Sequence, residues 1–81
     1  MSMIIYIKPT CPWCREALAY LDQAGFQYEV RDVLADPVSF DRMREISSQS
    51  LTPTLETDGK ILADFDTGQL SVFLQEHGIS P

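Results

Sequence analysis

The chain has 81 residues, with 12 acidic and 6 basic side chains, a formal net charge of −6 and a pI near 4.4. This length fits one domain, residues 1–81, and the negative charge argues against nucleic acid as a partner, because phosphate binding needs a positive surface. No stretch approaches the roughly twenty apolar residues of a membrane span, and no signal-peptide pattern is evident, so we expect a cytoplasmic protein without a membrane partner.

The first part of the sequence predicts a strand, a helix and a second strand. Met3–Ile7 is almost continuously apolar, which is typical of a strand buried on both faces, and a helix is expected from about Cys11 to Gly25. Phe26–Val33 alternates between apolar and polar residues and predicts a half-exposed strand, parallel to the first in a right-handed βαβ unit. The residues expected to face the core are Ala17, Leu18, Leu21, Ala24, Phe26, Tyr28 and Val30.

A second helix is expected over the middle of the chain. Asp36 is a favourable N-cap and Pro37 suits the first helical position, so the helix should begin there and run to about Ile46. The polar stretch 47–50 then predicts a loop. The residues expected to face inward are Phe40, Met43 and Ile46.

The last part of the sequence predicts a hairpin and a third helix. Thr54–Thr57 and Lys60–Asp64 are short strands joined by Asp58-Gly59, a strong hairpin signal because both central residues take positive φ. Asp66 can cap a final helix, which Gly78 closes and in which Leu70, Phe73 and Leu74 face inward. The βαβαββα order predicts one α/β domain, a four-stranded mixed sheet with three helices distributed over both faces.

Both cysteines lie in Cys11-Pro12-Trp13-Cys14, at the predicted start of the first helix. A thiol there meets unpaired backbone N–H groups and the positive end of the helix dipole, which lower its pKa and favour the reactive thiolate. Cys11 is therefore the predicted nucleophile, and Cys14, one turn further along, the thiol that resolves a mixed disulfide. The alternatives are two inert core cysteines, or half of a zinc site that lacks two ligands. We predict no metal site.

With these cysteines, this element order and a proline at the start of the third strand, the chain resembles a glutaredoxin over essentially its whole length. The most specific part is Lys8–Cys14, where Trp13 stands in the place usually held by Tyr or Phe. Leu51-Thr52-Pro53 lies where the family has Thr-Val-cis-Pro, and Asp66-Thr67 lies where the family opens its last helix. The resemblance implies a thioredoxin-like fold and a thiol–disulfide oxidoreductase that needs no bound cofactor.

Residues on both sides of Cys11 are candidates for binding substrate or glutathione. The Lys8 ammonium can stabilise the thiolate and attract the glycine carboxylate of glutathione, or it is simply solvated. Pro12 and Trp13 are the candidates that follow Cys11. Trp13 is expected to be exposed and to form a wall against the substrate, or to pack on the loop around Pro53.

The resemblance implies a second group of binding residues. A cis bond before Pro53 would turn the Thr52 backbone toward the cysteines, where its N–H and C=O pair with a substrate like an added strand. The alternative is a trans proline that begins an edge strand. In the family the N-terminus of the last helix receives the γ-glutamyl end of glutathione, which assigns that role to Asp66, Thr67 and the adjacent Phe65.

Three departures from the family pattern weaken the expected binding of glutathione. Ala63-Asp64 stands where Gly-Gly is common, so Asp64 is expected to crowd the site or to add negative charge. Leu51-Thr52 replaces the Thr-Val pair. Phe40 occupies the position of a residue that holds the glycine carboxylate, although Arg44, one turn later, is a substitute.

We therefore expect a monomeric, glutathione-dependent dithiol oxidoreductase. Its partners would be glutathione, as reducing co-substrate, and proteins that carry disulfides or bound glutathione. One alternative is a glutaredoxin-like hydrogen donor that thioredoxin reductase reduces. A second, from another class, is a dimer that shares an iron–sulfur cluster; Pro12 argues against it by stiffening the turn that a shared cluster must fit.

Overall fold

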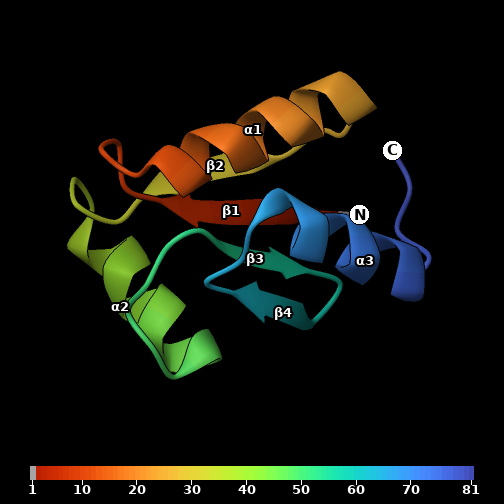
Figure 1. Ribbon diagram of the computed structural model, residues 1–81. Coiled ribbons are helices and arrows are strands. Elements are labelled where there is room, and N and C mark those ends of the chain that lie inside the picture. The colour runs from red at the N-terminus through yellow and green to blue at the C-terminus, as the bar shows by residue number, and fades with distance from the viewer. Residues whose placement is uncertain (1) are drawn as a thin grey trace.

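A computed structural model describes residues 2–81 and places four strands in one sheet, in the order β2-β1-β3-β4. Strand β1 runs parallel to β2 and antiparallel to β3, and β4 is antiparallel to β3, so the predicted mixed sheet is confirmed. Among the described residues, none of the helices has the length and apolar character to cross a membrane. The elements in Figure 1 are β1 (Met3–Ile7), α1 (Pro12–Ala24), β2 (Glu29–Asp32), α2 (Pro37–Ser47), β3 (Thr54–Thr57), β4 (Lys60–Ala63) and α3 (Thr67–Glu76).

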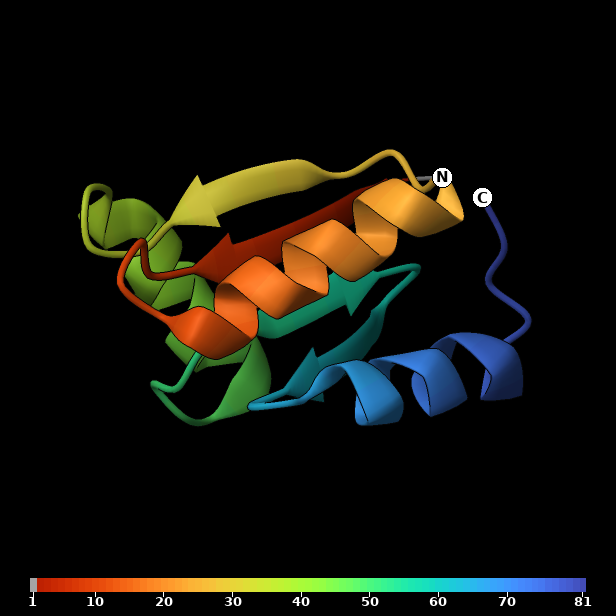
Figure 2. The same cartoon turned by 45° about the horizontal axis from the view of Figure 1, so that its top comes forward.

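Strand β1 divides the core into two parts because its side chains alternate between the faces of the sheet. Met3, Ile5 and Ile7 pack with α1 and α3 on one face. Tyr6 packs with Met43 of α2 on the other face. Figure 2 shows the same arrangement, with α1 and α3 in front of the sheet and α2 behind it. The predicted three layers and the burial of the first strand on both faces are confirmed.

Several predicted details of the elements are corrected. Strand β2 spans only Glu29–Asp32, and Val30 is 44 % exposed because β2 is an edge strand. Ala24 is exposed because it lies in the final turn of α1, beyond Leu21, the last buried residue of that helix. Strand β4 ends at Ala63, since Asp64 adopts the left-handed φ of 53° and so leaves the extended conformation.

The predicted turn and cap residues lie at the ends of the helices and strands, as expected. Asp58 and Gly59 have φ of 51° and 74°, so the hairpin signal is confirmed. The Asp36 side chain accepts a hydrogen bond from the Val38 N–H at 3.2 Å, as an N-cap does. Such a cap stabilises a helix by about 1 kcal/mol. Local sequence chemistry therefore accounts for where these elements begin and turn.

A partly buried polar network joins α2 to the sheet. The Tyr6 hydroxyl of β1 donates to Glu56 Oε1 of β3 at 2.8 Å, and Arg42 Nη2 of α2 donates to Glu56 Oε2 at 2.8 Å. Burial and the neighbouring Glu56 raise the pKa of Tyr6, which keeps its hydroxyl protonated as the donor. The network matters for the site because α2 leads directly into the 48–53 loop that faces the cysteines.

Candidate active site

The two sulfur atoms lie at the N-terminus of α1, in different environments. Cys11 is the N-cap residue, and its Sγ accepts a hydrogen bond from the backbone N–H of Cys14 at 3.2 Å. Both residues are free thiols. Cys14 is only 1 % exposed, whereas Cys11 is half-buried. A disulfide that approaches from solvent therefore meets the sulfur of Cys11, and Cys14 stands behind it.

The surroundings separate the pKa values of the two thiols. Burial opposes ionisation of Cys11, but hydrogen bonds from Cys14, from the Thr52 side chain and from the Trp13 backbone outweigh it and hold the pKa of Cys11 below its ordinary value. Burial and the adjacent Cys11 raise the pKa of Cys14. The surroundings thus favour the thiolate of Cys11 and the protonated thiol of Cys14.

These pKa directions predict the pH dependence of alkylation. A thiol with a lowered pKa is lost as a nucleophile only when the pH falls through that lowered value, so Cys11 should react with iodoacetamide at a lower pH than free cysteine does. Buried Cys14 should remain unmodified. The measurement is the alkylation rate of reduced protein against pH, with the modified residue identified by mass spectrometry. Thr52→Val, which removes the hydroxyl at similar volume, should move the Cys11 midpoint upward; an unchanged midpoint would contradict the role given to this hydroxyl.

The segment around Pro53 lies against the nucleophile. The Thr52-Pro53 bond is cis, as the family resemblance predicts. The carbonyl oxygen of Thr52 accepts a hydrogen bond from Cys11 Sγ at 3.8 Å, and Pro53 is fully buried. The Pro53 carbonyl in turn accepts from the Asp64 N–H at 2.9 Å. The start of β3 and the segment after β4 therefore meet beside the first turn of α1.

Gln49 organises the loop before Thr52, and the sequence analysis missed it. Its Nε2 donates to Ser47 Oγ at 2.8 Å and to Thr54 Oγ1 at 3.1 Å, and its Oε1 accepts from the Leu51 N–H at 2.6 Å. Thr54 Oγ1 also donates to the Leu51 carbonyl at 2.9 Å. One amide therefore joins the end of α2 to the start of β3. Residues 47–50 suggested only a polar loop, because these bonds depend on partners that the fold brings together.

Two basic residues, Lys8 and Arg44, lie on the α2 side of the site. Lys8 Nζ donates to the Ser50 carbonyl at 3.3 Å, which ties the end of β1 to the loop before Thr52. The Arg44 guanidinium lies over the Phe40 ring, 5.8 Å from its centroid. Arg44 also lines a polar hollow of about 480 Å³ together with Ser50. The side chain named as a substitute for a carboxylate-binding residue is therefore near this loop.

Trp13 and the segment before α3 form the opposite side of the site. Trp13 is 58 % exposed, as predicted, and lines a hollow of about 180 Å³ with Asp64, Asp66 and Gln69. Phe65 also borders this hollow, but its ring is buried in the core. Phe65 can therefore contact a substrate only through its main chain. Two carboxylates therefore border the hollow that the family resemblance assigns to glutathione.

The N-terminus of α3 satisfies part of its own hydrogen-bonding capacity. Asp66 Oδ1 accepts from the Gln69 N–H at 2.8 Å, and the Asp66 N–H donates to Gln69 Oε1 at 3.0 Å. This reciprocal capping box confirms Asp66 as the N-cap. The Asp66 and Gln69 N–H groups are thus occupied. Thr67, also predicted to bind glutathione, follows Asp66 as the first residue of α3.

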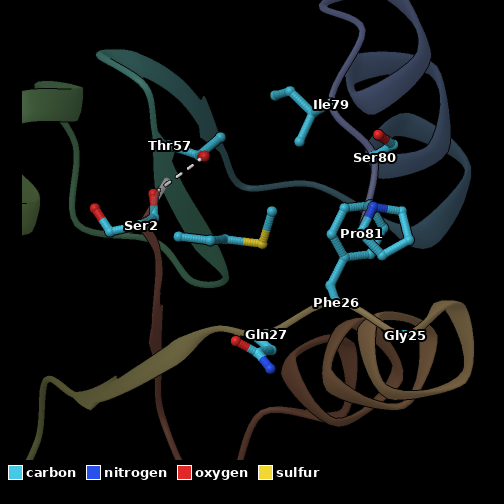
Figure 3. A pocket seen from close by; sticks show the side chains of 9 residues that line it. Ser2, Gly25, Phe26, Gln27, Thr57, Ile79, Ser80 and Pro81 are labelled. Carbon is cyan, nitrogen blue, oxygen red and sulfur yellow. Dashed lines mark hydrogen bonds between the residues drawn. The ribbon is translucent and has the colours of Figure 1, made fainter.

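The other end of the sheet carries a separate cavity of about 270 Å³ between the N-terminal segment, the end of α1 and the C-terminal segment (Figure 3). Its lining includes Met3, Phe26 and Ile79, with no charged side chain and neither cysteine. Within residues 2–81, no three His, Cys, Asp or Glu side chains gather as metal ligands would. The two cysteines therefore lie outside this cavity.

Comparison with known proteins agrees with this geometry. Residues 3–62 match the protein family described as glutaredoxin. An uncharacterized glutaredoxin-like 8.6 kDa protein of the rubredoxin operon of Clostridium pasteurianum is 31 % identical over 72 residues, which cover 89 % of this chain and 96 % of that protein.

Two solved structures extend the comparison to the fold. The crystal structure of a thioredoxin-like protein has a TM-score of 0.82 and 29 % identity, and the match covers 90 % of this chain and all of that one. The glutaredoxin-like NrdH-redoxin of Escherichia coli has a TM-score of 0.77 at 18 % identity, over 89 % of this chain and 93 % of that one. The second likeness concerns the fold alone.

Proposed function

This chain belongs to the glutaredoxin family of thiol–disulfide oxidoreductases, and we propose that it is a monomer that reduces protein disulfides and glutathione mixed disulfides. In this proposal Cys11 is the nucleophile and Cys14 the resolving thiol. The observation that carries it is the pairing of a half-buried thiol of lowered pKa with a buried thiol of raised pKa, one helical turn apart.

The proposed reaction moves two electrons in two exchange steps. The Cys11 thiolate attacks one sulfur of the substrate disulfide, which forms a Cys11–substrate disulfide and releases the other substrate sulfur as a thiolate. Cys14 then loses its proton and attacks Cys11 Sγ, which forms the Cys11–Cys14 disulfide and releases the second substrate thiolate. The substrate is reduced and the protein oxidised. We propose that the main chain of Thr52 pairs with the substrate backbone during the first step, since its carbonyl lies beside Cys11 Sγ.

For the step that restores the dithiol, we propose glutathione. The features that support it are the exposed indole of Trp13 beside the nucleophile and the positive charges of Lys8 and Arg44 near the 48–53 loop, which suit an anionic tripeptide. Thr67, at the start of α3, supplies a hydroxyl and a main-chain N–H for the γ-glutamyl carboxylate.

A specific observation favours a second reductant, an enzyme of the thioredoxin reductase type. Asp64 and Asp66 border the hollow in which the γ-glutamyl end of glutathione would lie, and the capping box already uses the N–H groups of Asp66 and Gln69. Two carboxylates weaken the binding of a third by like-charge repulsion. Reduction by a protein dithiol does not require that hollow to accept a carboxylate.

One assay separates the two reductants. Oxidised protein is offered either glutathione with glutathione reductase or thioredoxin reductase, and NADPH consumption is followed in each case. Glutathione-linked turnover is the expected result. Asp64→Asn should raise it about two- to threefold, because one screened like charge is removed. Asn also tolerates the left-handed conformation that Asp64 adopts.

The matched control for Asp64→Asn is Asp58→Asn. Asp58 is an exposed aspartate at φ 51° in the β3–β4 turn, so the two changes remove the same charge from the same backbone conformation. The control should leave the glutathione-linked rate unchanged. Turnover with thioredoxin reductase and none with glutathione would reject glutathione as the reductant and support the second candidate.

A further inference from the structure

Two adjoining hollows lie along α3, and the first of them is beside the thiol site. The hollow beside Trp13 and a larger one of about 460 Å³ share two lining residues, Asp66 and Gln69. The larger hollow is lined by Leu62 of β4 and by residues of α3, which follows β4 in Figures 1 and 2, and it reaches Glu76 in the last turn of the helix. We call the two hollows together the α3 groove. It begins at Trp13, one of the two residues between the cysteines, and ends at Glu76 in the last turn of α3.

The lining of the α3 groove combines apolar surface with unpaired negative charge. Val72 is 52 % exposed and Leu62 half-buried, so aliphatic surface faces the larger hollow. Asp64 borders the groove at the Trp13 end and Glu76 at the other, and no Lys or Arg lines it. Within residues 2–81, neither of these carboxylates has an ion-pair partner. An apolar floor between unpaired carboxylates is complementary to a segment that carries aliphatic and cationic side chains.

We propose that the α3 groove binds the segment that flanks the reacting cysteine of a protein substrate, and that it selects segments with aliphatic residues and Lys or Arg. This inference rests on the proposed reduction of protein disulfides and names the substrate class for it. Helix α3 has ten residues and is about 15 Å long, which four or five residues of an extended peptide would span.

The position of the groove fits the exchange reaction. Trp13 lines the groove and lies two residues after Cys11, so a substrate cysteine at Cys11 can place its neighbouring residues over the indole and then along α3. A lysine or arginine directly beside that cysteine meets Trp13 and Asp64, where cation–π and ion-pair contacts act together. A cationic residue further along the peptide meets Glu76. Glutathione is too short to reach the Glu76 end, so this selectivity applies to protein substrates.

The test measures binding without redox chemistry. Trp13 is the only tryptophan of the chain and lies at the mouth of the groove, so its fluorescence reports on occupancy. Reduced protein is titrated with short peptides in which lysines and leucines flank a serine that stands in for cysteine, on either side in separate peptides. Matched peptides carry glutamates in place of the lysines. The lysine peptides should bind at least about tenfold more tightly than the glutamate peptides at low ionic strength, with the difference shrinking as salt is added.

A pair of double variants separates the groove from the general negative charge of the protein. Asp64→Asn with Glu76→Gln should weaken binding of the lysine peptide about three- to tenfold, as expected for the loss of two exposed ion pairs. Asp58→Asn with Asp41→Asn removes the same charge from exposed positions outside the groove and should leave binding unchanged. Equal weakening by both double variants, or equal binding of both peptides, would overturn the inference.

Two further measurements complete the design. Sedimentation of the free protein should show a monomer; a dimer that Val72→Asp dissociates would mean that a second copy covers the groove, and would also overturn the inference. The rate of reaction with a small neutral disulfide tests the proposed function separately. Selective peptide binding without thiol exchange would reject the proposed function but support the binding role of the groove. Thiol exchange without selective binding would support the proposed function but reject that binding role.

Discussion

Cys11→Ser is expected to abolish every thiol-transfer activity of the protein. A serine hydroxyl stays protonated at neutral pH and does not form a stable bond to a substrate sulfur, so the first exchange step is lost. The loss should be on the order of a thousandfold or more, down to the uncatalysed rate. The measurement is turnover on two substrates, a protein disulfide and a glutathione mixed disulfide, and both should fail together.

The fold should survive this substitution, which makes the result interpretable. Cys11 is the N-cap residue of α1, and its side chain accepts a hydrogen bond from the Cys14 N–H at 3.2 Å. Serine is a preferred N-cap residue and can accept the same bond. Circular dichroism and thermal unfolding should therefore match the unmodified protein. Residual turnover on either substrate by a folded Cys11→Ser protein would show that Cys11 is not the sole nucleophile.

Cys14→Ser is expected to divide the two activities. A protein disulfide leaves its second sulfur attached to Cys11, and only Cys14 lies in position to release it, so this activity should fall to background. A glutathione mixed disulfide ends as Cys11 bound to glutathione, which a second glutathione can remove from solvent without Cys14. Turnover on that substrate should stay within about threefold of the unmodified protein.

The structure gives the reason why this substitution should spare Cys11. One hydrogen bond to Cys11 Sγ comes from the backbone N–H of residue 14, which serine retains, and the serine hydroxyl can replace the one that the Cys14 side chain supplies. The contributions of Thr52 and of the Trp13 backbone to the lowered pKa of Cys11 also remain. A mixed disulfide between Cys11 of the Cys14→Ser protein and the protein substrate should accumulate and be visible by mass spectrometry. Equal loss of both activities would contradict the glutathione route and assign Cys14 a part in the first step as well.

Most of the fold was predictable because its signals are local. The apolar run Met3–Ile7, the Asp58-Gly59 turn and the cap at Asp36 each act within a few residues, and the structure has all three as predicted. The burial of Leu70, Phe73 and Leu74 follows from helical periodicity in the same way. The errors occurred where exposure depends on neighbouring elements. Val30 has the pattern of a half-buried strand, but the sheet places it on an outer edge.

The sequence by itself placed both cysteines one turn apart at the N-terminus of a helix, where unpaired N–H groups and the helix dipole favour a thiolate. The tertiary structure made the two thiols unequal, because it buries Cys14 and brings Thr52 to Cys11. What faces those thiols was decided by the tertiary structure. Thr52 reaches Cys11 only through the pairing of β3 with β1, and Gln49 acts only because the fold brings Ser47, Leu51 and Thr54 around its amide. The α3 groove likewise requires the packing of α3 beside β4. A sequence pattern specifies neighbours within a few residues, whereas these contacts join positions that only the packed sheet and helices bring into reach.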